Sequence, residues 1–338
     1  QQDIFMDMSH AEIYIEAKLE EDVVPPDATG TCTLTNNAGA FLFQSITYEL
    51  NGREIEKVRD PGLTSTVKNL LCLNKQESMA LNIAGWNYPE ENGDNVVTPI
   101  IATTGEFNFL MPLNHLFGIF ADYTNSILGK QKIKLLRSRN DDNCHINATG
   151  TKKAKINFST VELRVRHIYP NDAIKIKLFE NIAKNTPIFM GFRSWEIHEL
   201  PALRQTTRDI WTVKSMSERA RYVIVFFQTL RKDNYNCTIF DHINITDIKL
   251  YLNAEMYPYE NLNLNFQKKR YTELFRMYTD FQRTYLGKDH SEPLLDFNEF
   301  LTKPIFVIDC SKQNEALRSS TIDVKLEFSR YTGPVLCR

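Results

Sequence analysis

The sequence predicts an all-β fold built from two β-sandwich domains in tandem, each carrying a short inserted helix. Three observations support this prediction. The chain has 338 residues, which is more than one sandwich core needs. Apolar and polar residues alternate in many segments, as they do in strands buried on one face. One order of strand, turn, helix and further strands occurs twice along the chain.

The first elements of the N-terminal half follow from local patterns. Alternation over residues 13–19 and 46–50 predicts two strands with one buried face. Asn51 and Gly52 follow the second of these strands, and this pair favours a tight type I′ turn into a returning strand over residues 53–58. A helical period over residues 64–73 then predicts an amphipathic helix.

The rest of this half is predicted as three strands and a helix. The strands cover residues 106–110, 131–137 and 161–167, and a short helix is expected over residues 114–128. We expect the last strand to bury its apolar side and expose its charged side: Val161, Leu163 and Val165 against Glu162, Arg164 and Arg166.

The domain boundary is placed where Pro170 and Asn171 end this strand and cap a helix. The prediction is an N-terminal domain over residues 1–170 and a C-terminal domain over residues 171–338. Further strands are expected over residues 193–199, 222–228, 248–253, 305–309 and 321–328. The second of these is an unbroken apolar run and predicts a strand buried on both faces.

The two halves share a short repeat. Residues 46–51 and residues 248–253 both begin with Ile and end with Leu-Asn, and an amphipathic helix follows each. This order indicates a duplicated sandwich that carries one conspicuous helix per copy.

Composition limits the partners and the compartment. The 40 basic and 42 acidic residues give a net charge of -2, so any contact with nucleic acid is expected to be weak or indirect. The basic residues 267–270 precede a helix, and either a local genome contact or that packed helix explains them. The six cysteines are scattered singly and are interpreted as reduced thiols. The sequence shows no signal peptide or membrane span, which favours the cytoplasm or nucleus over secretion.

No local motif supports catalysis. The sequence has no nucleophile elbow, phosphate loop or dinucleotide-binding glycine pattern, and its seven histidines include no close pair. Adjacent Cys144 and His145 are a weak candidate for a metal site, and the acidic pairs at 90–91 and 141–142 are weak candidates for calcium. We therefore expect a protein that is not an enzyme and that needs no cofactor or metal.

Four stretches in a fixed order carry a resemblance to a known family. They are residues 43–52, 129–138, 161–170 and 250–259. Together they resemble the double jelly-roll major capsid proteins of Polinton/Maverick elements and related viruses. The resemblance implies two jelly rolls, a homotrimer that forms a pseudo-hexameric capsomer, and an icosahedral shell. It also implies neighbouring capsomers and penton or minor capsid proteins as partners, a place in the virion capsid, and assembly in the host cytoplasm or nucleus. The second domain is expected to be shortened at its C-terminal end.

An aromatic stripe supplies the candidate inter-subunit contacts. It lies on a helix predicted from residue 271 to residue 285, which Gly287 ends. The stripe is wide for one small core, so it serves either core packing alone or also a contact between copies. Its members are Tyr271, Phe275, Tyr278, Phe281 and Tyr285.

Two other functions remain open on the residues alone. A non-enzymatic β-sandwich binding module, of the lectin or receptor-binding type, would also be rich in aromatic residues and would act through a pocket between loops. A glycoside-processing protein would need two acids in one cleft, and the sequence singles out no such pair. A lectin-type module would not ordinarily explain the helix repeated after each Leu-Asn strand.

Overall fold

The structure is a computed structural model that describes residues 4–21, 30–87, 104–147, 152–184, 187–200, 203, 206–216, 220–229, 236–313 and 322–331. By packing, the chain divides into two compact units. Unit 1 comprises Gln1–Val67, Met79–Asn87 and Val97–Ile197, and unit 2 comprises Lys68–Ser78, Tyr88–Val96 and His198–Arg338.

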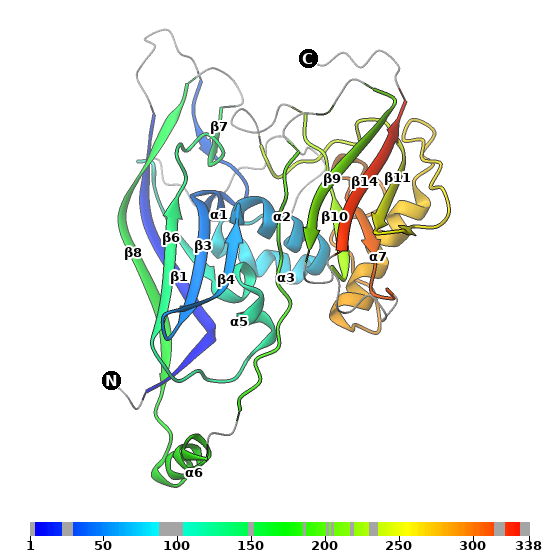
Figure 1. Cartoon of the computed structure of the whole chain (residues 1–338). Helices are drawn as coiled ribbons and strands as arrows, with labels where there is room; N and C mark the ends of the chain where they lie inside the picture. The colour runs from blue at the N-terminus through cyan, green and yellow to red at the C-terminus, as the bar shows by residue number, and fades with distance from the viewer. Residues whose placement is uncertain are drawn as a thin grey trace. The chain divides into compact units, whose positions relative to one another are not determined.

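Unit 1 contains two antiparallel sheets of three strands (Figure 1). The first sheet has the order β5-β1-β8: β5 (Glu106–Pro112), β1 (Phe5–Glu21) and β8 (Ala154–Ile168). The second has the order β4-β3-β6: β4 (Arg53–Arg59), β3 (Phe43–Leu50) and β6 (Gln131–Arg137). A short pair joins β2 (Thr33–Leu34) to β7 (His145–Ile146).

The core of unit 1 lies between these sheets. Phe43 of β3 stacks on Phe158 of β8 with ring centroids 6.4 Å apart, so the sheets face each other. Tyr48 of β3 packs edge-on against Phe120, with 4.7 Å between the centroids. Phe120 lies on the short helix α5 (Gly118–Asp122), which follows another short helix, α4 (Leu113–Leu116). The sequence predicted one helix over residues 114–128, and the structure has two shorter ones because the extended backbone of Phe117 interrupts it.

Four further helices are assigned in the first part of the chain. They are α1 (Ala38–Phe41), α2 (Pro61–Cys72), α3 (Lys75–Ala80) and α6 (Asp172–Ala183). A 3-10 turn, η1, covers Leu81–Ala84. The helices predicted over residues 64–73 and after Asn171 are thus confirmed. The side-chain oxygen of Asn171 accepts a hydrogen bond from the Ile174 amide at 2.9 Å, as an N-cap does.

Unit 2 has a four-stranded antiparallel sheet, a strand pair and one long helix. The sheet has the order β12-β11-β14-β9: β12 (Glu255–Tyr257), β11 (Ile245–Leu252), β14 (Ile322–Arg330) and β9 (Arg208–Met216). The pair joins β10 (Tyr222–Val225) to β13 (Phe306–Asp309), and α7 (Thr272–Leu286) packs on β13. A 3-10 turn, η3, covers Glu299–Thr302.

One aromatic cluster joins the two strand groups of unit 2. The ring of Phe227 lies 5.8 Å from that of Phe306 on β13 and 5.4 Å from that of Phe328 on β14. The sheet and the strand pair therefore share one core. The strand predicted as buried on both faces is β10, which is shorter than expected and half-buried at every residue. That prediction is wrong because β10 pairs only with β13 among the described strands.

Two further predictions concern the segment over residues 193–199 and the domain boundary. The strand expected over residues 193–199 is absent, because the segment pairs with no strand and is held by side-chain contacts instead. The predicted boundary at residues 170 and 171 coincides with the end of β8, whereas the packing division counts α6 and the segment up to Ile197 with unit 1. Residues 332–338, on which the expected early end rests, lie outside the described residues.

Candidate assembly surface

The core face of the first sheet is uncovered along part of β8, at Val161 and Leu163, whereas Ala154 and Ile156 at the start of this strand are buried. In the antiparallel register Val161 lies opposite Ile15, and Leu163 lies opposite Ile13. Directly opposed residues point to the same face of a sheet. Ile13 and Ile15 are 1% and 0% exposed, but Val161 and Leu163 are both 44% exposed.

The predicted burial of Val161 and Leu163 is therefore wrong for the single chain, although they lie on the expected face. β8 is the edge strand of its sheet, and no described strand pairs with its outer edge. Burying such an apolar side chain completely contributes about 1.5–3 kcal/mol, so this face favours a covering partner.

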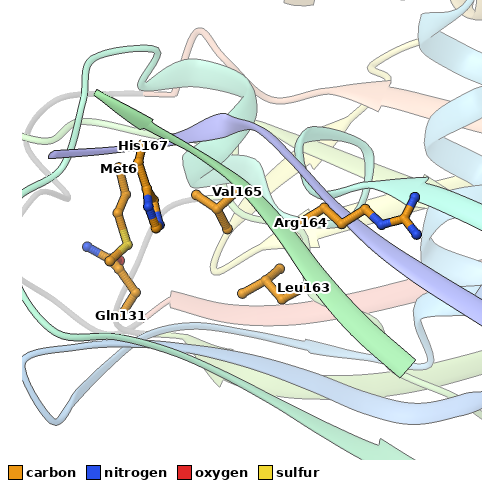
Figure 2. Close-up of a pocket in the computed structure, with 6 residues that line it drawn as sticks. All are labelled: Met6, Gln131, Leu163, Arg164, Val165 and His167. Atoms are coloured by element: carbon orange, nitrogen blue, oxygen red, sulfur yellow. The ribbon is translucent and has the colours of Figure 1, made fainter. Parts of the chain in front are cut away.

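A groove lies beside these residues, between β8 and the edge strand of the second sheet. It has a volume of about 550 Å³ and is open to solvent. Figure 2 shows Leu163, Val165 and His167 on one side of β8, near Met6 and Gln131, with Arg164 pointing the other way. The guanidinium carbon of Arg164 lies 3.6 Å from the centre of the Tyr14 ring. We call the surface formed by Met6, Gln131, Leu163, Val165 and His167 the open groove.

A second uncovered apolar surface lies on the described residues 171–184 and 187–192, which we call the arm. Its helix α6 buries none of its residues and projects beyond the sheets of unit 1 (Figure 1). Ile174 and Ile176 on the helix and Ile188 beyond it are exposed, and Phe189 is 87% exposed. A helix of this length is marginal in water without packing, so the arm also favours a partner surface.

The arm is held firmly at its far end. The backbone N–H of Arg193 donates to Asp122 Oδ2 at 2.7 Å, and its guanidinium donates to both carboxylate oxygens. A Cβ atom at Gly118 would lie 1.8 Å from the Arg193 carbonyl oxygen, so only glycine fits there. The Glu56 carboxylate accepts hydrogen bonds from the Gly118 and Ile119 amides at 2.9 Å each and caps α5.

The aromatic stripe of α7 belongs mainly to the core of unit 2. Tyr271, Tyr278 and Phe281 are buried, and the Tyr278 hydroxyl donates to the Leu70 carbonyl oxygen at 2.8 Å. The same hydroxyl accepts from the Leu295 amide at 3.1 Å. Core packing accounts for the burial of these three residues in the single chain, and their role in an inter-subunit contact stays a prediction.

The other two residues of the stripe keep part of their surface. Phe275 and Tyr285 are half-buried, and their rings lie 5.3 Å from Phe297 and 5.9 Å from Tyr222 respectively. Their role in an inter-subunit contact stays a prediction. No sequence pattern distinguished them from the three buried residues, because all five occupy one helical face.

His145, part of the weak candidate for a metal site, is hydrogen-bonded within the chain. His145 Nδ1 lies 2.9 Å from the Asp141 carbonyl oxygen, and its Nε2 accepts from the Ala154 amide at 3.1 Å. Both ring nitrogens are thus occupied by the backbone. Burial lowers the pKa of His145, in keeping with a neutral ring.

The acidic residues Asp141 and Asp142 also interact with basic side chains within the chain. Asp141 forms an ion pair with Arg137, and Asp142 lies 2.7 Å from Lys153 Nζ. The pair at 90–91 lies outside the described residues. Among the residues that the structure describes, no three His, Cys, Asp or Glu side chains are grouped to hold a metal.

No disulfide joins the cysteines in the described part of the chain, which are Cys32, Cys72, Cys144, Cys237 and Cys310. Burial raises the pKa of Cys310 to about 12, so this thiol stays protonated at neutral pH. No helix in the described part of the chain is long and apolar enough to cross a membrane.

The comparisons with known proteins identify the family. The family model of the double jelly roll-like domain matches residues 32–333, and the chain belongs to this family. The fold predicted from the sequence, two jelly rolls in tandem, is thereby confirmed. A search of curated protein sequences finds no match.

Solved structures agree with this fold. The Faustovirus major capsid protein has a TM-score of 0.51 and 9% identity over 98% of this chain and 83% of that chain. The mavirus major capsid protein has a TM-score of 0.50 and 9% identity over 95% of this chain and 76% of that chain. At such identity the likeness concerns the fold.

Proposed function

We propose that this chain is a major capsid protein whose copies associate into capsomers and build an icosahedral shell. Family membership and the fold shared with two viral major capsid proteins support the proposal. The single observation that carries it is the core face left open at Val161 and Leu163. A chain that leaves core-facing side chains uncovered favours association with further chains.

The finer assembly proposed is a homotrimer with a pseudo-hexagonal outline. Each unit would supply one jelly roll, so three copies would present six similar sandwiches around one axis. Neighbouring capsomers and penton or minor capsid proteins would complete the shell. Assembly is proposed in the host cytoplasm or nucleus, and the net charge of -2 supports only weak or indirect contact with the genome.

We propose no catalytic role. The two similar structures are viral major capsid proteins, and association needs no chemically special residue. The rival function is a non-enzymatic binding module of the lectin or receptor-binding type, which would work as a monomer or small oligomer.

The test is the mass of the purified chain in solution. Light scattering at several concentrations, salt levels and pH values should give a trimer or larger particles. Negative-stain electron microscopy of the same sample should show hexagonal outlines or spherical shells. A monomer under every condition would contradict the proposal and favour the binding module.

A further inference from the structure

We infer that the arm of one copy packs its apolar side chains into the open groove of unit 1 in a second copy. This inference rests on the proposed function and names the surfaces through which copies associate. Both surfaces belong to unit 1.

The first step is that each surface is uncovered in the single chain. The groove side of β8 exposes Val161 and Leu163, whereas their opposite residues Ile15 and Ile13 on the same sheet face are buried. The arm exposes Ile174, Ile176 and Phe189 and buries no residue of its helix. The arm of the same chain therefore leaves its own groove uncovered.

The second step is the matching chemistry of the two surfaces. Met6, Leu163 and Val165 give the groove an apolar lining, and its polar members are Gln131, His167 and Arg164. The charged end of Arg164 points away from the other lining residues and lies against the Tyr14 ring. The arm presents branched aliphatic side chains and one aromatic ring. Contact between them would remove apolar surface from water on both sides.

The arm also has about the size of one side of a protein interface. The arm covers residues 171–184 and 187–192, and a partner in a standard protein interface contributes ~20–30 residues. The arm is also presented in a defined place, because Asn171 caps its helix and Asp122 holds Arg193 at its far end. Ordering one fixed projection costs less entropy than ordering a free tail.

The number of arms and grooves on each copy also agrees with the proposed trimer. Every copy carries one arm and one groove on different parts of the same unit. A head-to-tail contact of this kind satisfies every copy only when the ring closes, and a closed ring of three agrees with the trimer proposed above. In such a ring each contact covers the arm of one copy and the groove of the next, so every arm and every groove is covered.

The test measures association of arm and groove variants of the whole chain by sedimentation velocity. Ile188→Ser combined with Phe189→Ser changes the arm, and Leu163→Ser changes the groove. Each change should weaken association at least about tenfold, since apolar surface no longer becomes buried. All of these side chains are exposed in the single chain, so thermal unfolding of the monomer should stay close to wild type.

Matched controls come from unit 2. Tyr259 is 85% exposed and Ile210 lies exposed on the edge strand β9. Tyr259→Ser is the control for the arm, and Ile210→Ser is the control for the groove. Both should associate as the wild-type chain does.

Combining the arm and groove changes in one chain tests whether the two surfaces contact each other. If they do, the combined variant loses little more than the stronger of the two separate variants. Fully additive losses, or wild-type association of the arm variant, would overturn the inference while leaving the capsid proposal intact. A wild-type chain that never associates would overturn both.

Discussion

Asn51 and Asn253 make the same pair of hydrogen bonds at the same point of their respective units. Each follows a Leu at the end of a strand and has a left-handed backbone, with φ of 51° and 55°. Asn51 donates its N–H to the Lys130 carbonyl oxygen at 2.9 Å, and its Oδ1 accepts from the Lys130 amide at 2.8 Å. Asn253 does the same with Asp323 at 3.0 and 2.8 Å.

This relationship gives the repeat in the sequence a structural meaning. In each unit the Leu-Asn pair ends a strand. The Asn then forms its two hydrogen bonds with a residue from later in the same unit. The same device in both units supports a duplicated domain more strongly than the shared letters do.

The first prediction concerns this device. Asn51→Ala removes the Oδ1 acceptor and places a Cβ-bearing residue with no local hydrogen bond in the left-handed region, which should cost about 1–2 kcal/mol of unfolding free energy. Asn51→Asp keeps an acceptor oxygen and should cost less. Urea unfolding followed by tryptophan fluorescence measures both. Equal losses for the two variants would show that the hydrogen bond to the Lys130 amide contributes little.

The second prediction concerns the anchor of the arm. In Gly118→Ala the new methyl group would overlap the Arg193 carbonyl oxygen, so the backbone must move and the contact between Arg193 and Asp122 must loosen. We expect a loss of about 1–3 kcal/mol and faster proteolysis within the arm. Gly191→Ala is the control, because a Cβ there meets nothing within 4 Å. Unchanged cleavage rates in Gly118→Ala would contradict the proposed anchoring.

The third prediction concerns the core role of α7. Tyr278→Phe leaves the Leu70 carbonyl and the Leu295 amide without the hydroxyl that joins them. Because the site is buried, the loss should be about 1–3 kcal/mol. Thermal unfolding of Tyr278→Phe and of the exposed control Tyr259→Phe measures the difference. A control that loses as much stability would count against this explanation.

The fourth prediction concerns pH. Burial lowers the pKa of His145 and His242 below the ordinary value of 6.5, so the unfolded chain binds more protons than the folded chain as the pH falls below 6.5. Stability should be fully present above about pH 6.5 and should decline below it, by at most about 1.4 kcal/mol per pH unit for each histidine.

Urea unfolding at pH 7.5 and at pH 5.5 tests the pH prediction. His145→Gln should flatten the decline, whereas the exposed His290→Gln should leave it unchanged. If the two variants show the same pH dependence as the wild-type chain, protonation of His145 does not contribute to the loss.

Much of the local structure could be predicted from short patterns. The turn at Asn51 and Gly52, the cap at Asn171 and the end of α7 at Gly287 all follow from residues that favour one backbone geometry. Strand β6 was predicted with its observed bounds, since its alternation is strict. These features depend on contacts between residues close together in the chain.

The candidate assembly surface could not be predicted in this way. Alternation in β8 showed which side chains share a face, but whether that face is covered depends on the strand beside it. Val161 and Ile15 share a face, and only Ile15 is buried. The exposure of the arm could not be predicted from the sequence either, because the apolar residues of α6 have the same spacing as those of a packed helix.

The sequence by itself therefore determined the strand and helix pattern, the two-domain plan and the family resemblance, since each is written in local spacing. The tertiary structure alone decided which apolar faces are covered. It joined Asp122 to Arg193, 71 residues apart, in place of the strand expected over residues 193–199, and it buried Tyr278 while leaving Leu163 open. Burial depends on what packs against a residue from a distant part of the chain, and periodicity contains no record of that neighbour.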